Sequence, residues 1–302
     1  MKLCALIVTY NRLDKLKFCW AATRLLDFNN IVIVNNASTD GTSEWLSTIC
    51  DSRLTILNSD TNDGGAGGFY KGSEWICSNI HCDWVVFFDD DAYPDRNLIE
   101  NFHNSVKDNI DAIATKVVDN EGIRCKMNIP WSEIPNTAKE IKNYIKNPQL
   151  YEVPENTRSK IKTFSFVGVF IKKSILTKTY KNIKADLFIY YDDLFYSWFL
   201  HKKNMEMVYE PSMIFHHDIS QYTYSAMSPW KIYYLTRNLI LSKYIFIDNA
   251  PFSTLSILLR LAKYLFLVQH SPEKILYLRF YAKGIFDGVR NKLKIRCNSD
   301  VI

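Results

Sequence analysis

The chain has 302 residues, of which 47% are hydrophobic and 23% are charged, a composition that fits a folded protein of one or two domains. Its seven cysteines are scattered and odd in number, so they favour a reducing cytosol over a disulfide framework. No uninterrupted apolar run reaches the roughly 18–20 residues of a membrane-spanning helix, and the short apolar start does not have the pattern of a signal peptide.

The net charge of +5 is unevenly distributed along the chain. Residues 228–302 carry 12 Lys and Arg against 4 Asp and Glu, whereas residues 1–227 carry 25 against 28. A basic, aromatic C-terminal region favours an anionic membrane surface or another anionic partner. An ordinary helical subdomain with solvated lysines is the alternative. Nucleic acid is not expected as a partner, because no recognition motif accompanies the charge.

Apolar strand patterns and helical patterns alternate over the first 120 residues. The predicted strands are 2–10, 31–36, 54–58, 84–88 and 112–118, and the helices between them are 14–26, 42–49, 66–78 and 97–107. Thr42 is the expected N-cap of the second helix. This alternation predicts an α/β fold with a mostly parallel sheet flanked by helices, in which ligands bind at the carboxyl ends of the strands.

The second part of the chain has a different organisation. Residues 121–160 contain four prolines and many Asn and Lys, which predicts an irregular insertion. Further strands are expected at 163–172, 205–209 and 214–217, with a helix at 193–201. From Trp230 the pattern is helical, with breaks near Pro251 and Pro272. These patterns divide the chain into an α/β domain at 1–227, with halves 1–120 and 121–227, and a basic helical region at 228–302.

Three consecutive carboxylates follow the apolar run at 84–88. Asp89, Asp90 and Asp91 would repel each other when ionised and would be costly to bury unpaired. A divalent cation is the natural counter-charge, because hard cations prefer carboxylate oxygens as ligands. A solvated turn is the alternative. Polar residues also follow the other strands of this half: Thr9, Asn11 and Arg12; Asn35 and Asn36; and Asn62 and Asp63.

Five of the ten glycines of the chain fall between Gly64 and Gly72, directly after Asn62 and Asp63. Glycine lets a backbone approach a ligand closely, and amide groups before a helix can bind a ligand oxygen. We therefore include Asn62 and Gly65 among the expected ligand-binding residues. The run matches neither the P-loop nor the dinucleotide-binding pattern, and a flexible loop without a ligand is the alternative.

Two further polar pairs could carry chemistry. Asp192 and Asp193 stand at the start of a predicted helix, where they could cap it or supply a general base. His216 and His217 are adjacent on a predicted strand, so their side chains point to opposite faces and only one would enter a site. Imidazole is a good ligand for Mn²⁺, and a purely structural histidine is the alternative.

Together these segments resemble the inverting nucleotide-sugar glycosyltransferases of glycosyltransferase family 2. The matching segments are 7–12, 34–42, 62–72, 89–91, 192–193 and 217, and the resemblance is weak between residues 120 and 160. It implies the GT-A fold, with a Rossmann-like nucleotide-sugar half at 1–120 and an acceptor half at 121–227. The glycine run with a triple aspartate is most similar to the galactofuranosyltransferase and rhamnosyltransferase branch. Residues 233–238 also resemble a segment of bacterial surface-polysaccharide transferases.

The resemblance also implies a role for each candidate residue. The donor-binding residues would be Thr9, Arg12, Asn36, Asn62, Gly65, Asp89 and Asp90, although most family members have Asp where this chain has Asn36. The metal ligands for Mn²⁺ or Mg²⁺ would be Asp89, Asp91 and His217, with His216 in a neighbouring position. Asp193 would be the catalytic base, and Asp192 would orient the acceptor.

The implied reaction is a metal-dependent, inverting transfer of a sugar from a nucleotide-sugar donor. UDP-galactofuranose is the leading donor, and dTDP-rhamnose or a UDP-hexopyranose is the runner-up. The expected acceptor is a lipid-linked oligosaccharide in capsule or O-antigen synthesis, used by a peripheral protein at the cytoplasmic face of the cell membrane. The sequence leaves the oligomeric state open, a homo-oligomer included.

Two alternatives belong to other functional classes. A sugar nucleotidyltransferase has a similar sheet and similar metal-binding aspartates. It would carry a basic, phosphate-binding loop near the N-terminus, which residues 9–13 do not match. A non-catalytic binding subunit is the second alternative, and the presence of both Asp193 and His217 argues against it.

Overall fold

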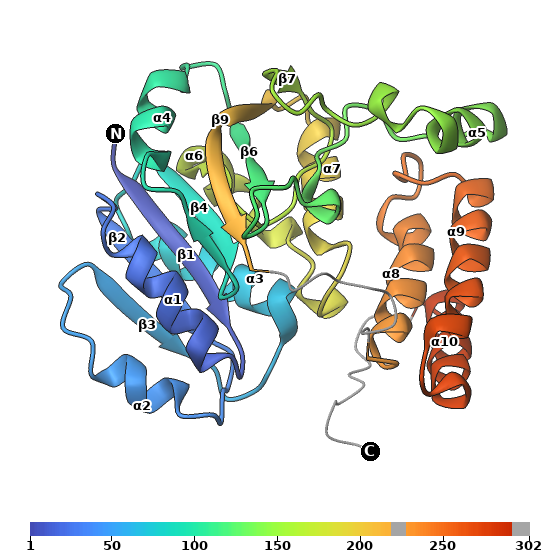
Figure 1. The fold of residues 1–302 in the computed structure, drawn as a ribbon, viewed down its shortest axis with the longest axis horizontal. Helices are drawn as coiled ribbons and strands as arrows, with labels where there is room; N and C mark the ends of the chain where they lie inside the picture. Colours follow the sequence, from blue (N-terminus) through green and yellow to red (C-terminus); the bar gives the residue numbers. More distant parts are fainter. Residues whose placement is uncertain (219–227, 292–302) are drawn as a thin grey trace.

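A computed structural model describes residues 1–218 and 228–291 of the chain. Within this part, nine strands form one sheet, helices pack on both of its faces, and a layer of three helices lies at one side (Figure 1). The expected α/β fold is therefore confirmed. Strands from both predicted halves of the α/β domain, 1–120 and 121–227, belong to the same sheet.

The sheet has the strand order β3-β2-β1-β4-β8-β6-β9-β5, with β7 paired to β9. The first four strands in this order run parallel, and β8 lies antiparallel between β4 and β6. The strands are β1 (Leu3–Thr9), β2 (Asn30–Asn35), β3 (Leu54–Asn58), β4 (Trp84–Asp89), β5 (Ala92–Pro94), β6 (Ala112–Val118), β7 (Ser159–Lys160), β8 (Val169–Lys172) and β9 (Met207–His217).

Most helices begin and end close to the predicted positions. The α-helices are α1 (Leu13–Thr23), α2 (Thr42–Ser47), α3 (Gly64–Asn79), α4 (Leu98–Ser105), α5 (Ala138–Lys146), α6 (Lys173–Thr179), α7 (Asp192–Lys202), α8 (Lys231–Ile245), α9 (Thr254–Phe266) and α10 (Lys274–Val289). Short 3₁₀ turns are η1 (Lys126–Asn128), η2 (Pro148–Leu150), η3 (Tyr180–Asn182), η4 (Ala185–Leu187) and η6 (Leu267–His270). The prediction that Thr42 is the N-cap of α2 is wrong. Gly41 occupies the N-cap position, with φ +88°, and Thr42 is the first helical residue of α2.

The chain changes direction in the sheet beside β1. It runs outward from β1 to β2 and β3, and then returns to place β4 on the other side of β1. Val8 and Asp89 are register partners, so the carboxyl ends of β1 and β4 lie side by side. Open α/β sheets bind ligands at such a switch point, which is where Thr9 and the three aspartates lie.

Three strand predictions for the second half need correction. The segment 163–172 forms a strand only from Val169, because Gly168 turns the backbone at φ +73° and its missing Cβ makes room for Phe215 and Thr115. The segments 205–209 and 214–217 form one strand, β9, which continues through Pro211. A register shift between β6 and β9 accommodates that passage. The insertion at 121–160 is mostly irregular, but it contains α5, which begins with a capping box.

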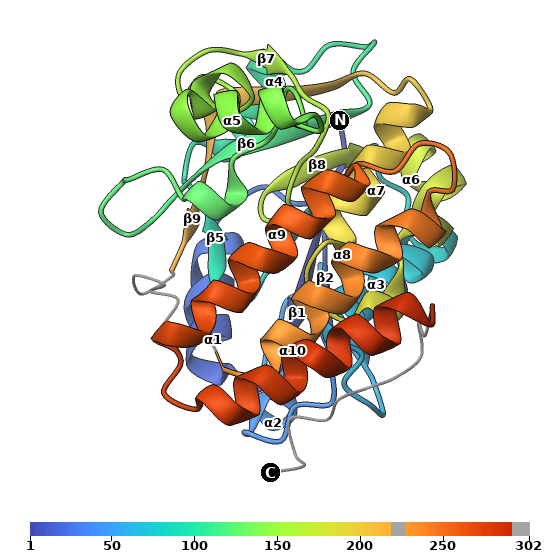
Figure 2. The same cartoon turned by 90° about the vertical axis from the view of Figure 1, so that its right-hand side faces the viewer.

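The C-terminal helices α8, α9 and α10 form the layer that faces the viewer in Figure 2. The expected breaks near Pro251 and Pro272 are confirmed, because they fall in the connections between these helices. Phe195 and Trp198 of α7 share a buried cluster with Leu239 and Leu241 of α8 and with Phe252. None of the helices in residues 1–218 and 228–291 combines the length and apolar character needed to cross a membrane.

Candidate active site

Asp90 joins the carboxyl ends of β1 and β4. The hydroxyl of Thr9 donates to Asp90 Oδ2 at 2.8 Å, and the amide of Tyr10 donates to the same oxygen at 3.3 Å. Arg12 Nη1 lies 3.3 Å from the other carboxylate oxygen, Oδ1. The predicted donor-binding residues Thr9, Arg12 and Asp90 are therefore one connected group, and Thr9 and Asp90 are almost completely buried.

Asp91 lies between a cation and a histidine. Arg12 Nη1 donates to Asp91 Oδ2, and His217 Nε2 lies 3.4 Å from Asp91 Oδ1. The pairing of β5 with β9 places His217 opposite Ala92, next to Asp91 in the chain. On the far side of the ring, His217 Nδ1 is 3.0 Å from Asn128 Oδ1. Asn128 was not predicted, because it lies in the irregular segment 121–160 and nothing in its local pattern marks it.

His216 points to the other face of β9, as adjacent strand residues must. Its ring stacks on Tyr93 at 4.8 Å between centroids, and its Nε2 lies 3.6 Å from Asp95 Oδ2. The structure therefore brings His217, and not His216, to the aspartate group.

Asp90 is buried, Asp89 and Asp91 are partly buried, and the three carboxylates act on one another. Burial, together with Asp91 and Asp90, raises the pKa of Asp89 well above its usual range. Burial also raises the pKa of Asp90 to about 6, against the opposing effects of Arg12 and the Thr9 hydroxyl. Burial acts in the same direction on Asp91, but His217 and Arg12 outweigh it and hold the pKa of Asp91 to about 2. Arg12 is the cation that acts on all three carboxylates and opposes the effect of burial on each of them.

The donor atoms around Asp91 and His217 fit a divalent cation. Since Asn128 Oδ1 can only accept, His217 Nδ1 carries the proton, and Nε2 faces the carboxylate oxygen of Asp91. The lone pair of His217 Nε2 and that of Asp91 Oδ1 face each other across 3.4 Å, so a proton or a cation is needed between these two atoms. A ligand histidine whose other nitrogen is held in this way is the usual arrangement at metal sites. Within the described residues no three His, Cys, Asp or Glu side chains are placed to hold a metal ion together, so Asp89 stays a predicted ligand beside the observed pair Asp91 and His217.

The glycine run is mostly the start of helix α3 rather than a loop, which corrects its predicted conformation, and ligand binding by Gly65 stays a prediction. A Cβ on Gly68 would lie 2.4 Å from Val8 Cγ1, and one on Gly72 would lie 2.2 Å from Leu6 Cδ1. These glycines therefore let α3 pack closely on β1. Gly64 has φ +70°, and a Cβ there would lie 2.1 Å from Phe188 O. Only Gly65 of this run has open space where a Cβ would stand.

Polar groups around the start of α3 are partly engaged inside the protein. The amide of Gly64 donates to Asn62 Oδ1 at 2.9 Å, and the amide of Ala66 donates to Phe188 O at 3.1 Å. Asn36 Nδ2 donates to Gly64 O at 2.7 Å, while its buried Oδ1 has no hydrogen-bond partner. The amide side of Asn36 is thus used to hold α3, and a contact with uridine stays a prediction for Asn36 Oδ1.

Asp192 and Asp193 begin α7 after a strained segment. Phe188, Tyr190 and Tyr191 all have positive φ, at +69°, +65° and +68°, and bulky residues rarely adopt this conformation. Burial and the neighbouring Asp193 raise the pKa of Asp192 to about 8. Burial raises the pKa of Asp193 to about 6, although the backbone amide of Leu194 donates to its Oδ1 at 2.6 Å. The two groups therefore differ in protonation near neutral pH.

Helix α8 holds the strained segment in place. Asn238 Nδ2 lies within hydrogen-bonding distance of three carbonyl oxygens, at 3.0 Å from Leu187, 2.8 Å from Ile189 and 3.0 Å from Tyr190. Arg237 Nη2 donates to the carbonyl oxygens of Asp186 and Leu187 at 2.8 and 3.0 Å. We call Arg237 and Asn238 the α8 clamp. Residues 233–238 therefore include the two side chains that hold the segment before the predicted base.

The segment that leads into Asp192 lies beside the start of helix α3. Helix α3 packs on β1 through Gly68 and Val8, and β1 is the neighbour of β4 in the sheet. Phe188, which precedes α7, contacts the first turn of α3. The structure thus connects segments that are far apart in sequence, from β1 through α3 to the segment that leads into Asp192.

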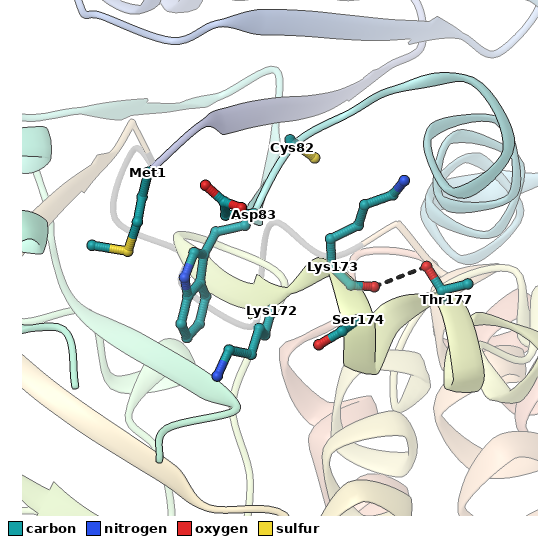
Figure 3. A pocket seen from close by; sticks show the side chains of 8 residues that line it. Met1, Cys82, Asp83, Lys172, Lys173, Ser174 and Thr177 are labelled. Atoms are coloured by element: carbon teal, nitrogen blue, oxygen red, sulfur yellow. Dashed lines mark hydrogen bonds between the residues drawn. The ribbon is translucent and has the colours of Figure 1, made fainter. Parts of the chain in front are cut away.

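A separate pocket of about 420 Å³ lies at the other end of strands β1 and β4, away from the aspartates, and Figure 3 shows the side chains that line it. Met1 and Trp84 stand at the starts of β1 and β4, whereas the aspartates stand at the end of β4. Lys172 and Lys173 line the same pocket. Because the pocket lies at the amino ends of β1 and β4 and the aspartates lie at the carboxyl end of β4, the pocket is not the site described above.

The model of the family "Glycosyl transferase family 2" matches residues 4–164, which is more than half of the chain. The chain belongs to glycosyltransferase family 2. The matched range contains the donor-side residues and the triple aspartate, whereas Asp192, Asp193 and His217 lie beyond it. No sequence among curated proteins matches this family 2 glycosyltransferase.

Solved structures share the fold of this family 2 glycosyltransferase. Residues 1–349 of TarS from S. aureus superpose with TM-score 0.52 and 16% identity, over 97% of this chain and 90% of that one. The mannosyltransferase PcManGT from Pyrobaculum calidifontis, in complex with GDP-Man and Mn²⁺, gives 0.50 and 15%, over 96% and 75%. GalNAc-T7 with UDP, GalNAc and Mn²⁺ gives 0.54 and 10%, over 97% and 58%. At these identities the similarity shows the GT-A fold.

Proposed function

We propose that this family 2 glycosyltransferase transfers galactofuranose from UDP-galactofuranose, with inversion, onto a lipid-linked oligosaccharide in capsule or O-antigen synthesis. One observation carries the chemistry: the aspartates stand at the end of β4, and the segment that leads into Asp192 contacts the start of helix α3, which packs on the neighbouring strand β1. The choice of donor is supported by the glycine run followed by a triple aspartate. A nucleotide-sugar donor is also supported by the ligands of the similar structures, GDP-Man in one and UDP with GalNAc in another.

Asp193 acts as the general base in this proposal. With a pKa of about 6 it is ionised at neutral pH, and a base works best with a pKa near the working pH. The acceptor oxygen bonds to the anomeric carbon while its proton passes to Asp193. The bond between the anomeric carbon and the diphosphate oxygen breaks on the opposite side, so one displacement inverts the configuration. Asp192, with a pKa of about 8, stays protonated and can donate a hydrogen bond to the acceptor.

Asp91 and His217 would hold a divalent cation, Mn²⁺ or Mg²⁺, with Asp89 as the third predicted ligand. When bound, the cation would stabilise the negative charge that builds up on the departing nucleoside diphosphate. The Mn²⁺ in two of the similar structures supports this assignment. Arg12 now supplies a counter-charge to Asp91, and Thr9 fixes Asp90 beside it. These contacts keep the nucleotide side of the site formed at the switch point of the sheet.

The acceptor side of the proposal depends on the C-terminal helices. Residues 228–291 carry nine Lys and Arg against three Asp and Glu. A basic helical layer beside the catalytic pair suits an enzyme that works at the cytoplasmic face of a membrane, where anionic lipids attract cationic side chains. A lipid-linked glycan would meet the enzyme at that surface.

A donor panel tests the proposed function. The purified full-length chain is incubated with UDP-galactofuranose, dTDP-rhamnose or UDP-galactopyranose, with Mn²⁺, Mg²⁺ or EDTA, and the release of nucleoside diphosphate is followed. We expect turnover that requires the divalent cation and is fastest with UDP-galactofuranose. An NMR spectrum of the product reports its anomeric configuration. Faster turnover with another donor would replace the proposed sugar, and undiminished turnover in EDTA would remove the cation from the proposal.

A further inference from the structure

Helices α9 and α10 expose many apolar side chains on their outer side. Nine of the eighteen large hydrophobic side chains that are exposed within residues 1–218 and 228–291 lie on these two helices. On α9 they are Leu255, Leu258, Leu259, Leu265 and Phe266. The exposed fraction is 58% for Leu258 and 72% for Phe266. A patch of this kind on a protein surface usually marks an interaction site.

Helix α9 is apolar on both of its sides. Its inner side contacts the protein through Ile257, through Arg260, which stacks over Phe252, and through Tyr264, whose hydroxyl lies 2.5 Å from that of Tyr191. Leu258 and Leu259 follow Leu255 by three and four residues, and Leu265 and Phe266 follow Leu258 and Leu259 by seven, so these side chains lie along one stripe of the helix. The inner contacts fix α9 in the fold, so the exposed leucines of its outer stripe are not needed for packing and are available to bind a partner.

Helix α10 extends the same surface. Its exposed apolar residues are Ile275, Leu278, Phe286 and Val289. The hydroxyl of Tyr277 donates to Tyr264 O at 2.6 Å, and the hydroxyl of Tyr281 donates to Leu261 O at 2.9 Å, so α10 lies along α9. Both helices face the viewer in Figure 2. We call the exposed apolar side chains of α9 and α10 the apolar face.

Basic side chains accompany the apolar face. Exposed cations on the same two helices are Lys263, Lys274, Arg279 and Lys283, and Arg290 directly follows α10. A second copy of the chain, docked symmetrically on this face, would bring two surfaces of the same positive charge together, which is unfavourable. An anionic lipid surface offers the opposite charge together with an apolar layer for the leucines. Charge complementarity therefore favours lipid over self-association.

We propose that the apolar face of α9 and α10 docks on an anionic lipid bilayer, with its leucine and phenylalanine side chains inserted at the headgroup level. The proposal deepens the proposed function, because it rests on a lipid-linked acceptor reaching the site from that side. Tyr264 on the inner side of α9 contacts Tyr191, which directly precedes Asp192 and the predicted base Asp193. Helix α9 therefore has the docked surface on its outer side and the start of α7 on its inner side.

Vesicle co-sedimentation of the full-length chain tests the docking surface. We expect binding to vesicles of phosphatidylcholine with phosphatidylglycerol and much weaker binding to phosphatidylcholine alone. The double variant Leu258→Glu, Phe266→Glu should lower the partition coefficient at least about tenfold, because two apolar anchors become anionic. Leu25→Glu is the matched control, since Leu25 is 78% exposed near the end of α1 and should leave binding unchanged. Lys274→Glu with Arg279→Glu should weaken anionic binding by roughly fivefold per residue.

The outcomes separate docking from catalysis. Equal binding of the wild type and the Leu258→Glu, Phe266→Glu variant would overturn the proposal. A wild type that does not bind anionic vesicles would also overturn it. A dimer in light scattering that the double variant dissociates, without vesicle binding, would assign the face to a second copy instead. Nucleotide release is measured in parallel without vesicles. Intact turnover with no vesicle binding removes only the docking surface, whereas vesicle binding without turnover on any donor removes only the proposed function.

Discussion

At the scale of single residues, His216 and His217 provide a matched comparison on one strand. His217 faces Asp91, whereas His216 stacks on Tyr93. We expect His217→Ala to weaken the apparent affinity for Mn²⁺ by about 10- to 100-fold, because it removes a nitrogen ligand. His216→Ala should change it less than about twofold. Mn²⁺ titrations of the transfer rate and of the unfolding temperature measure both variants, and equal effects of the two substitutions would contradict the assignment.

Asp193→Asn tests the general base. Loss of a positioned base should lower kcat by about 10²- to 10⁴-fold and leave the dissociation constant of the donor nearly unchanged. In the wild type, kcat should fall as the pH drops through about 6, where Asp193 takes up a proton. The residual rate of Asp193→Asn should lack that pH dependence. Asp186→Asn is the control, because Asp186 is exposed on η4, and a wild-type kcat for Asp193→Asn would refute the role.

Asp192 should cost stability at neutral and alkaline pH. Its folded-state pKa of about 8 lies above the ordinary value of 3.8, so its favourable contribution is complete below pH 4 and is lost as the pH rises toward 8. Asp192→Asn keeps the neutral shape, and we expect it to raise the free energy of unfolding at pH 8 by roughly 2–4 kcal/mol relative to wild type. At pH 4 the difference should vanish. Calorimetric scans at both pH values decide this, and a pH-independent difference would contradict it.

At the scale of elements, the α8 clamp gives a prediction about positioning. Asn238→Ala removes the amide that lies near three carbonyl oxygens of the segment before Asp192. Because that segment is held in left-handed conformations, it should relax and misplace the base. A shift of about 1 Å can cost on the order of 10²-fold in rate. We therefore expect kcat to fall about 10- to 100-fold while KM for the donor changes little.

Ser242→Ala is the matched control for the clamp. Ser242 is also buried on α8, but its hydroxyl donates to Leu239 O in the same helix and does not reach the segment before Asp192. Both variants should lose about 1 kcal/mol or more of stability, and only Asn238→Ala should lose turnover. Equal loss of kcat in the two variants would mean that α8 acts through stability alone.

Elements with strong local patterns could be predicted from the sequence. The fully apolar stretches of β1 and β4 and the alternation of strands and helices over residues 1–120 were sufficient for the α/β fold. The glycine run was misread because its pattern describes both a loop and a tightly packed helix. The contacts that decide between them, Gly68 with Val8 and Gly72 with Leu6, are between elements distant in sequence. Likewise, Gly168 shortens the strand predicted at 163–172, which begins only at Val169, through its contacts with β6 and β9.

The candidate site was predictable where chemistry leaves a local mark. The consecutive aspartates after an apolar strand and the two aspartates at a helix start can be recognised from the sequence alone. Asn128 and the α8 clamp were not predictable as site residues, because an amide on a loop or helix acquires its role from what the fold places beside it. For Asn128 that neighbour is His217, 89 positions away.

At the scale of the whole molecule, the C-terminal helices are part of the folded unit. Tyr233 on α8 donates to Asp287 on α10 at 3.0 Å, and a Cβ on Gly284 of α10 would lie 1.9 Å from Thr236 Oγ1 on α8. Phe252 and Ile257 share a buried cluster with Phe195 of α7. A chain ended before Pro251 therefore loses more than a membrane anchor.

We expect the chain that ends at Ala250 to unfold roughly 10 °C or more below the full-length chain, and to lose transfer to a water-soluble acceptor. Each buried side chain of the size of Phe252 contributes about 1.5–3 kcal/mol, and several lose their partners together, which is enough for a shift of this size. The Leu258→Glu, Phe266→Glu variant is the control, because it alters only the apolar face and should keep both the unfolding temperature and the solution activity. A truncated chain that unfolds at the full-length temperature and retains kcat would show that α9 and α10 are an independent module. In that case the contact between Tyr264 and Tyr191 would have no part in holding the base.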